Sequence, residues 1–493
     1  MEQNRSSGIL LHPTSLPGKY GIGSLGNEAK LFIDYLALAG QKLWQVLPMG
    51  HTGYGDSPYQ CFSIFAGNPI LIDLDQIKVD GLLKADDLTT KIVFKDDVVD
   101  YGVVINFKGE MLKIAYNHFL DQHELPGSYH RFIQENDSWL HGYALFVALK
   151  EKFDGKPWWD WPEQFRSRDN EALKTFTAQS EKEIGFNKFC QYYFFKHWYS
   201  VKHHANSKGI SIIGDIPLYV AHDSADVWGS PHLFQFDENL LPIKVAGVPP
   251  DYFSETGQLW GNPLYDWDVM KNNGFKWWIG RVKASLDLYD FVRIDHFRGF
   301  EAYWSVTYGE ETAINGEWSQ APGMELFQII RNQMGELPII AEDLGIITHE
   351  VEELRDSFAF PGMKILQFAF DADEGNGYLP HNYKENFVTY TGTHDNDTLN
   401  GWYHSLESHI KNRVLDYADA NDKNIIKKII RLAWASVAKM AIIPLQDLLE
   451  LGGEARMNTP GTAAGNWQWR FTKDQLTTEK AGWLAHISKL YNR

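Results

Sequence analysis

The chain has 493 residues, enough for a large barrel with insertions or for two or three ordinary domains. Its 64 acidic and 46 basic residues give a formal net charge of -18. A field of that sign repels phosphate, which argues against a nucleic acid or an anionic membrane as partner. Two cysteines, Cys61 and Cys190, make no disulfide framework, and the first residues carry no apolar signal core. A cytoplasmic location is therefore expected.

Short apolar runs rich in Ile, Val and Leu recur along the chain, and we expect eight of them to be strands. They cover residues 9–12, 43–47, 210–216, 291–294, 339–342, 363–370, 387–391 and 440–445. Near-continuous apolar runs are typical of parallel strands buried on both faces. Helical patterns lie between many of them, at residues 27–40, 186–208, 273–289, 324–334 and 423–439, and Asn27 is placed to cap the first. The alternation predicts an α/β fold, a (β/α)8 TIM barrel.

Residues 1–493 are expected to form one catalytic barrel with inserted subdomains on its C-terminal face. The gap between the second and third runs is far longer than one strand–helix unit. We expect residues 51–190 to form a mostly helical insertion there. Residues 221–266, rich in Pro, Gly, Trp and Tyr, and residues 452–466, rich in Gly, Ala and Thr, are expected to be active-site loops.

The stretch from Gly21 to Gly26 matches the dinucleotide fingerprint G-x-G-x-x-G and precedes a predicted helix. It follows a loop containing Pro and Gly rather than a strand. The acidic residue expected at the end of the next strand is also missing. We therefore do not predict a nucleotide site. No zinc or phosphate-loop pattern occurs in the sequence.

Three carboxylates end predicted barrel strands, where the active sites of such barrels form. The first is Asp295, in the run that contains Arg293. Side chains alternate along a strand, so Arg293 and Asp295 share one face. A buried guanidinium there would hold Asp295 ionised, as a nucleophile requires. A structural Arg–Asp ion pair is the alternative interpretation.

The second carboxylate, Glu342, ends an apolar run, where burial would keep it protonated as a general acid must be. Its neighbour Asp343 points to the opposite side and is expected to be structural. The third, Asp395, follows His394 in a polar turn that can grip sugar hydroxyls, although a capped turn explains the spacing equally well. One ionised and one protonated carboxylate are the minimum set for glycosidic cleavage. A separation of about 5–5.5 Å would mean retention of configuration.

With these strand-end residues in their sequence context, the chain resembles 4-α-glucanotransferase, the amylomaltases or disproportionating enzymes of glycoside hydrolase family 77, over nearly its whole length. The resemblance rests on blocks of residues that occur in the family's order: His12-Pro13-Thr14-Ser15-Leu16, Trp44-Gln45-Val46-Leu47-Pro48, Ser57-Pro58-Tyr59, Gly214-Asp215-Ile216-Pro217, Arg293-Ile294-Asp295-His296-Phe297-Arg298-Gly299, Ala341-Glu342-Asp343-Leu344-Gly345 and Thr393-His394-Asp395. It implies Asp295 as nucleophile, Glu342 as general acid/base and Asp395 as transition-state stabiliser.

The resemblance also implies a set of substrate-binding residues. Tyr59 would stack on the sugar at the cleavage subsite, with Asp215, Arg293 and His394 bonded around it, and Trp260, Asn458 and Pro460 would face the acceptor. The implied reaction moves an α-1,4-glucan segment from a donor to the 4-OH of an acceptor, through a covalent glycosyl-enzyme. The implied partners are malto-oligosaccharides, maltose, glucans derived from starch or glycogen, and glucose. No metal or other cofactor is implied.

Two alternatives stay open at this stage. An α-amylase-like hydrolase would carry the same strand-end carboxylates on the same barrel. A catalytically silent glucan-binding protein would not need both Asp295 and Glu342.

Overall fold

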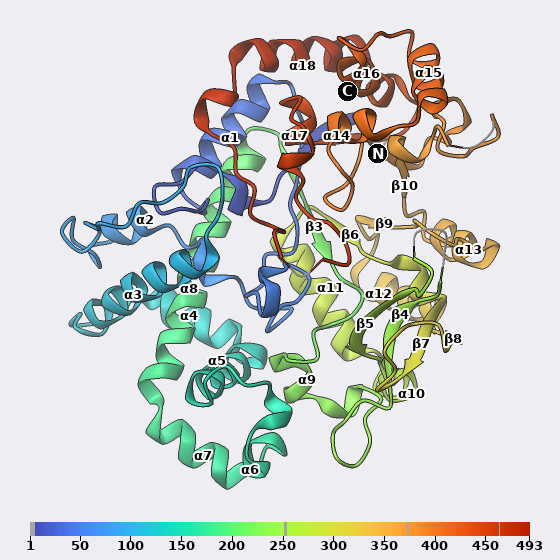
Figure 1. The fold of residues 1–493 in the computed structure, drawn as a ribbon. Helices are drawn as coiled ribbons and strands as arrows, with labels where there is room; N and C mark the ends of the chain where they lie inside the picture. The colour runs from blue at the N-terminus through green and yellow to red at the C-terminus, as the bar shows by residue number, and fades with distance from the viewer. Residues whose placement is uncertain (1–4, 251–253, 372–373, 463) are drawn as a thin grey trace.

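The computed structural model describes residues 5–250, 254–371, 374–462 and 464–493. Its larger sheet has eight strands in the order β10-β11-β12-β1-β2-β3-β6-β9, and all neighbours are parallel. A hydrogen bond of 2.9 Å from the backbone N–H of Ala341, at the end of β9, to the carbonyl of Pro361, before β10, links the two outer strands. The sheet thus curls into the predicted (β/α)8 barrel, which lies at the centre of the molecule (Figure 1).

Each predicted run overlaps one barrel strand, although β1 begins three residues before the run expected at 9–12. The strands are β1 Ser6–Leu10, β2 Leu43–Gln45, β3 Ser211–Ile216, β6 Phe291–Ile294, β9 Ile339–Ala341, β10 Gly362–Ile365, β11 Phe387–Tyr390 and β12 Met440–Pro444. The largest difference is at β10, which ends at Ile365 rather than continuing to Phe370. A 3-10 turn at Leu366–Phe368 follows it, so the apolar residues after Ile365 are buried in a turn and not in a strand.

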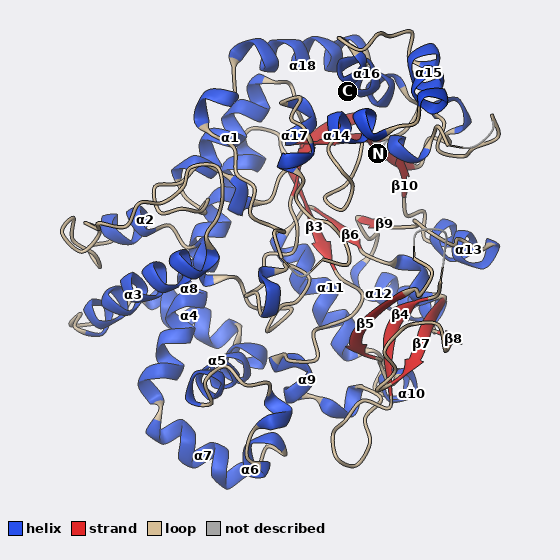
Figure 2. Cartoon of the chain, in the orientation of Figure 1, coloured by secondary structure: helices blue, strands red, loops and turns tan. Residues whose placement is uncertain are grey.

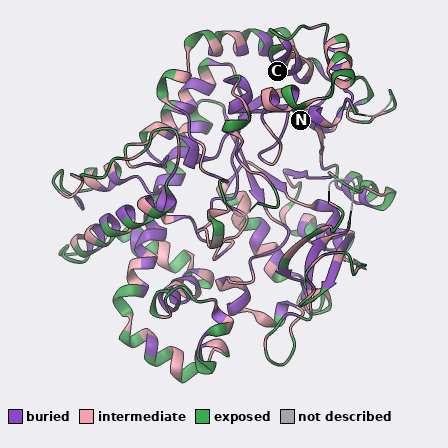
Figure 3. Ribbon diagram, viewed as in Figure 1, coloured by how far each residue is buried: buried purple, intermediate pink, exposed green. Residues whose placement is uncertain are grey.

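Two apolar layers bury the barrel strands on both faces (Figure 3). Along β3, Ile212 packs with the helices outside while Ile213 packs with the cluster inside the barrel. The same alternation places Ile339 and Ala341 of β9 outside and Ile340 inside. Residues two positions beyond an inward residue also point inward. This parity directs the side chains at the strand ends into the barrel mouth.

Helices are the main regular structure in the rest of the chain (Figure 2). The helices outside residues 51–190 are α1 Asn27–Leu38, α9 Ala225–Gly229, α10 Trp267–Asn272, α11 Lys276–Leu288, α12 Gly323–Met334, α13 His349–Ser357, α14 Leu399–Ser405, α15 Ser408–Tyr417, α16 Ile425–Ala435, α17 Leu445–Leu448 and α18 Thr478–Leu490. All five predicted helices exist. The expected cap was wrong by one residue, because Gly26 holds the N-cap position of α1 and Asn27 is its first helical residue.

The segment 51–190 holds α2 Leu74–Val79, α3 Tyr101–Leu120, α4 Gly127–Glu135, α5 Asp137–Lys152, α6 Glu163–Arg166 and α7 Asn170–Gln179. It also holds the first part of α8 Glu181–Ser207, which continues past the expected end at residue 190 and leads into β3. Buried aromatic side chains of α8 pack on α3 and α4, for example Phe189 against Phe119 at 5.0 Å and Tyr192 against Tyr129 at 5.4 Å. The long helix therefore connects this segment to the barrel.

A second, antiparallel sheet has the order β5-β4-β7-β8 and was not expected from the sequence. Its strands are β4 Lys244–Val248, β5 Gln258–Pro263, β7 Ala302–Thr307 and β8 Gly316–Gln320. The segment 221–266 is therefore not a plain loop, since it carries α9, β4 and β5. The sheet lies at the lower right in Figure 1 and gives Trp260, on β5, a rigid support. No helix in the described part of the chain is long and apolar enough to cross a membrane.

Candidate active site

Four charged side chains extend from the C-terminal ends of three adjacent strands. In β3 and β6, Asp215 lies beside Arg293 in the register of the two strands, and Asp295 follows directly after β6. Glu342 follows β9, the next strand along. All four share the inward parity of Ile213 and Ile340. The expected placement of Arg293 one step deeper than Asp295 on the same face is confirmed.

Arg293 lies between two carboxylates. One of its terminal nitrogens donates to both oxygens of Asp215, at 2.9 and 2.7 Å, and the other lies 2.9 Å from Oδ1 of Asp295. Although burial lowers the pKa of Arg293, the charges of Asp215 and Asp295 raise it well above its usual value. The guanidinium is therefore permanently charged, and it fixes the position of the Asp295 carboxylate, whose side chain keeps 31% of its surface exposed toward solvent.

Glu342 is buried and lies close to the Asp295 carboxylate. Burial and the nearby charge of Asp295 raise the pKa of Glu342 to about 8. Backbone N–H groups of His296 and Leu344 donate to its two oxygens at 2.6 and 3.0 Å, which orients the carboxyl group and opposes the rise. Burial prevails, so the group holds its proton at neutral pH. A protonated carboxyl group beside a carboxylate held by an arginine is the arrangement that acid-assisted displacement needs.

His296 supplies one of these two bonds through an unusual backbone. It has φ 51° and ψ 48°, a left-handed conformation that costs a non-glycine residue on the order of 1–3 kcal/mol. This turn after β6 directs its N–H at Glu342. Burial lowers the pKa of the His296 ring to about 4, so the ring is neutral, and it packs edge-on against Trp260 with centroids 4.8 Å apart. Sequence analysis assigned His296 no role, since nothing in a sequence marks a left-handed residue other than glycine.

Asp395 forms a third acidic position, in the loop after β11. Its Oδ2 lies 3.2 Å from Nε2 of His394, and its Oδ1 accepts a 2.6 Å bond from the side-chain amide of Asn458. Burial raises its pKa, but His394 and the Asn458 bond outweigh burial and lower the pKa of Asp395 to about 2. The guanidinium of Arg456 also donates to the backbone carbonyl of Asp395 at 2.5 Å. This carboxylate is ionised over the whole working pH range.

Tyr59 connects the group formed by Asp215 and Arg293 with the loop that carries His394 and Asp395. Its hydroxyl donates to Asp215 at 2.9 Å, and its ring stacks on His394 at 5.2 Å with an interplanar angle of 18°. Trp467 packs against both rings, at 6.0 Å from Tyr59 and 5.8 Å from His394. Sequence analysis did not single out Trp467, because it lies more than 400 residues from Tyr59 and its block carries no strand or motif signal. Its φ of 65° is a second left-handed backbone near the site.

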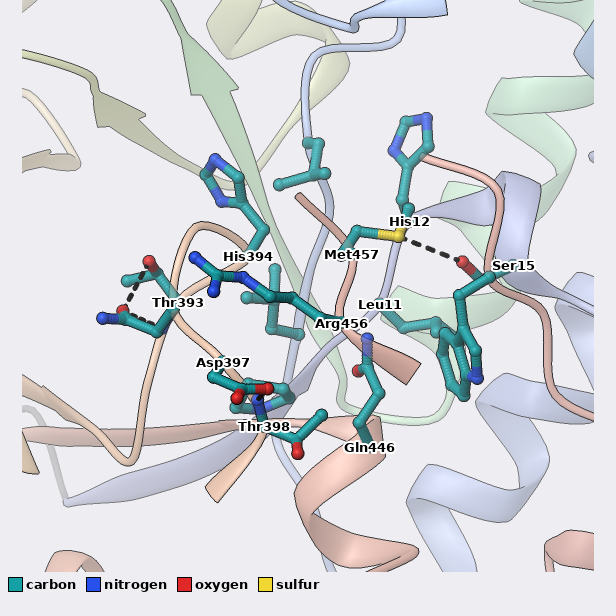
Figure 4. A pocket seen from close by; sticks show the side chains of 15 residues that line it. Leu11, His12, Ser15, Thr393, His394, Asp397, Thr398, Gln446, Arg456 and Met457 are labelled. Atoms are coloured by element: carbon teal, nitrogen blue, oxygen red, sulfur yellow. Dashed lines mark hydrogen bonds between the residues drawn. The ribbon is translucent and has the colours of Figure 1, made fainter. Parts of the chain in front are cut away.

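A small cavity of about 20 Å³ lies behind His394, enough for one water molecule (Figure 4). His12, at the end of β1, lines it together with His394, Arg456 and Met457. Burial and the neighbouring His394 lower the pKa of His12 to about 3, so its ring is neutral. Its Nδ1 is buried and has no hydrogen-bond partner among the described residues. The cavity belongs to the wall of the site.

The three residues expected at the acceptor side differ in how closely they are connected to the acidic side chains of the site. The ring of Trp260 packs against the ring of His296, and the backbone N–H of His296 donates to the Glu342 carboxyl group. The side-chain amide of Asn458, which was expected to face the acceptor, donates a hydrogen bond to Asp395. Pro460 is exposed in a turn where Thr459 accepts from Thr462 at 2.7 Å. Among the described residues, Pro460 makes no hydrogen bond with the other site residues.

Within the described ranges, no group of three or more His, Cys, Asp or Glu side chains could hold a metal ion. Asp343 does not join the site, as expected. It points away, accepts from the backbone N–H of Met363 at 2.7 Å and pairs with Arg355. Gly362 is required there, because a Cβ at that position would collide with the Asp343 carboxylate. Asp343 therefore ties β9 to β10 at the closure of the barrel.

A (β/α)8 barrel whose mouth holds an Arg-bound carboxylate, a protonated carboxyl group and a third ionised carboxylate is typical of enzymes that break glycosidic bonds. Comparison with known proteins narrows that class. A family model described as 4-alpha-glucanotransferase matches residues 11–477. The 4-alpha-glucanotransferase of Synechocystis sp. is 51% identical over 499 residues, covering 100% of this chain and 99% of that protein. The one from Thermus thermophilus is 48% identical and covers 100% of both.

A solved structure agrees with these matches. An amylomaltase from Streptococcus agalactiae in complex with acarbose superposes with a TM-score of 0.97, at 42% identity and covering 99% of each chain. The chain belongs to the 4-alpha-glucanotransferase family. The resemblance noted in the sequence and the expected enzyme class, a glycosyltransferase acting on α-1,4-glucans, are confirmed, and the α-amylase-like alternative is not better supported.

Proposed function

We propose that Asp295 is the nucleophile and Glu342 the general acid/base of a retaining transfer between α-1,4-glucans. The observation that carries this assignment is the contrast between the two groups. Arg293 binds Asp295 as an ion pair at 2.9 Å, while the pKa of about 8 keeps Glu342 protonated at neutral pH. In the first half-reaction a carboxylate oxygen of Asp295 forms a bond to the anomeric carbon. The bond to the glycosidic oxygen breaks, and that oxygen takes the proton of Glu342.

The second half-reaction reverses these steps with a new partner. Glu342, now ionised beside Asp295, removes the proton from the 4-OH of an acceptor. The acceptor oxygen bonds to the anomeric carbon, and the ester to Asp295 breaks. The acid is restored, and the product has the same anomeric configuration as the donor. Glu342 gives one proton to the leaving chain and gains one from the acceptor. The cycle therefore needs no other acid or base.

The remaining site residues would hold the sugar whose bond breaks. Tyr59, stacked on His394, offers an aromatic wall that can pack against the apolar face of a pyranose. Asp395 is ionised and held by Asn458, so it can accept from adjacent hydroxyls and stabilise positive charge developing on the ring. Asp215 and Arg293 complete the polar floor.

Transfer exceeds hydrolysis only when water is excluded and an acceptor is retained. The segments 221–266 and 452–466 are the candidates for this role. The first carries Trp260 to the Glu342 side, and the second reaches Asp395 through Asn458. Trp260 and Pro460 would then contact the acceptor chain.

The expected partners are malto-oligosaccharides, maltose, glucans from starch or glycogen, and glucose. The net charge of -18 opposes nucleic acid and anionic membranes, whereas a neutral glucan has no such penalty. The cytoplasmic location and the absence of a cofactor stay predictions.

Incubation with maltotriose alone tests the proposed reaction. Transfer yields glucose and a ladder of chains longer than the substrate, because each donor segment moves to another chain. Products no longer than maltotriose would indicate a hydrolase, and no turnover would indicate a binding protein. Labelling with a slow fluorinated glucosyl donor, followed by peptide mass spectrometry, should place the trapped sugar on Asp295.

A further inference from the structure

A separate cavity of about 180 Å³ opens beside Trp260, and its lining residues include neither Asp395 nor His394. Its walls come from segments far apart in the sequence, and the lining includes Gln60, Phe62, Trp159, His222, Trp260 and Asn262. It is nine times the volume of the cavity behind His394, at about 180 against about 20 Å³. Of the residues named here, only Trp260 has a role in the proposed mechanism.

One wall of the cavity is a rigid aromatic stack. The ring of Trp159 lies 4.0 Å from that of His222 with an interplanar angle of 17°, and His222 in turn stacks on Phe236 at 5.5 Å. Trp158 packs edge-on against both Trp159 and His222. Trp159 itself is only partly buried. A half-exposed indole fixed in one orientation can pack against the apolar C–H face of a pyranose without losing much side-chain entropy on binding.

The other walls carry polar groups that lack partners. Within the described part of the chain, neither the side-chain amide of Gln60 nor the indole N–H of Trp159 makes a hydrogen bond, and the buried Nε2 of His222 has none. The amide nitrogen of Asn262 donates to the carbonyl of Val220 at 2.8 Å, which fixes the side chain at the cavity edge. Polar groups inside a protein normally have partners. Apolar faces beside free donors and acceptors match a sugar ring and its hydroxyl rim.

The position of the cavity indicates which part of a glucan it would meet. Trp260 contacts His296 at 4.8 Å, and the backbone of His296 donates to Glu342 at 2.6 Å. Glu342 is the group that handles the leaving oxygen and the incoming 4-OH. Because Trp260 also lines the cavity, the cavity continues the path from Glu342 past Trp260, on the side of the acceptor and leaving group.

We propose that this cavity is a further glucose-binding subsite on the acceptor side, in which Trp159 stacks on a ring of the glucan chain beyond the ring that contacts Trp260, while Gln60 bonds to its hydroxyls. The proposal rests on the proposed transfer reaction. It makes the enzyme select acceptors by length, since glucose is too short to reach Trp159 and a longer malto-oligosaccharide fills the subsite.

Acceptor kinetics test the subsite. With a fixed donor, the acceptor KM is measured for glucose, maltose, maltotriose and maltotetraose, for the wild type and for Trp159→Ala, Gln60→Ala and Trp483→Ala. Trp483 is a partly buried tryptophan on α18, outside the site, and serves as the matched control. Loss of the Trp159 ring should raise the ratio of the longest acceptor's KM to that of glucose about 3- to 10-fold. Gln60→Ala should raise it in the same direction, and Trp483→Ala should leave it at the wild-type value.

A ratio that stays at the wild-type value in both Trp159→Ala and Gln60→Ala would overturn the subsite. If Trp159→Ala melts too low to assay, Gln60→Ala decides alone, because it removes no buried ring. Calorimetric binding of maltotetraose to Glu342→Gln, with and without Trp159→Ala, gives an independent readout, and equal affinity of the two proteins would also overturn it. Failure of the underlying reaction looks different, since wild-type enzyme would then make no chain longer than maltotriose.

Discussion

The side-chain amide of Asn458 donates to Oδ1 of Asp395 across 2.6 Å, although 63 residues separate them in the chain. The backbone N–H of Asn458 also donates to the carbonyl of His394 at 3.1 Å, and with the bond from Arg456 to the carbonyl of Asp395 the segment 452–466 is attached to the loop after β11 at three points. The carboxylate that should stabilise the transition state is thus oriented by a loop that would also border the acceptor. We therefore expect acceptor binding and charge stabilisation to be coupled through Asn458.

Loss of the Asn458 amide should weaken transition-state stabilisation. Asn458→Ala removes one bond to a charged group, worth about 1.5–3 kcal/mol, so kcat/KM should fall about 10- to 100-fold. Asn458→Asp adds a like charge and should raise the pKa of Asp395, which moves the acidic limb of the pH–rate profile upward. Steady-state kinetics from pH 3 to pH 9 measure both effects. Asn400→Ala, which removes a surface bond to the carbonyl of Glu450, is the control. Equal effects of Asn400→Ala and Asn458→Ala would contradict the assignment.

Removal of the nucleophile should abolish the covalent step. Asp295→Asn keeps the size of the side chain but lacks a nucleophilic carboxylate. Turnover should fall on the order of 10⁴-fold or more, and no fluorosugar adduct should form. Intact-protein mass spectrometry after labelling checks the adduct. Asp287→Asn, at an exposed aspartate paired with Lys283, should label like the wild type. Wild-type labelling of Asp295→Asn would refute the nucleophile.

The pKa of Glu342 predicts the basic limb of the pH profile. The acid is protonated below about pH 8, so kcat/KM should be highest below that value and fall as pH rises through it. Glu342→Gln has no proton to lose, so this limb should vanish together with most activity on maltotriose. A donor with a good leaving group, such as glucosyl fluoride, should recover much of the first half-reaction, because departure then needs no acid. Glu325→Gln, on the surface of α12, should keep the wild-type profile. A basic limb unchanged in Glu342→Gln would assign it to another group.

Tyr59 makes two separable contributions. Tyr59→Phe removes only the 2.9 Å bond to Asp215 and keeps the ring on His394, so kcat/KM should fall about 10-fold. Tyr59→Ala also removes the stacking wall and should cost considerably more, mainly in KM for the donor. Donor kinetics for both variants show the split. Tyr308→Phe, at an exposed tyrosine, is the matched control. Similar losses in Tyr59→Phe and Tyr59→Ala would mean that the ring does not contact the sugar.

Asp343 should matter for stability rather than chemistry. Asp343→Asn removes the buried charge partner of Arg355 and leaves it only the more exposed Asp356, and loss of one member of a buried pair costs about 3–5 kcal/mol. Urea unfolding measures this loss. The double variant Asp343→Asn with Arg355→Met should lose less than the sum of the single variants, because it leaves no unpaired charge. The folded fraction of Asp343→Asn should keep far more activity than Glu342→Gln, and the opposite order would contradict a structural role.

The sequence by itself was sufficient for the barrel and for the strand-end carboxylates. Apolar runs buried on both faces mark parallel strands, and the two-residue period of a strand puts Arg293 and Asp295 on one face. Both signals are local, so they can be read without knowing what each element packs against. The inward direction of Asp215, Asp295 and Glu342 follows from the same period.

Only the tertiary structure decided the rest of the site. The bond between Asn458 and Asp395, the packing of Trp467 on Tyr59 and the cavity beside Trp260 each join segments far apart in the chain. The antiparallel sheet was missed because β8 is largely exposed and has no apolar run to reveal it. The apolar run before Glu342 predicted its burial, but the charge of Asp295, which also raises the pKa of Glu342, comes from the end of a neighbouring strand in the packed barrel.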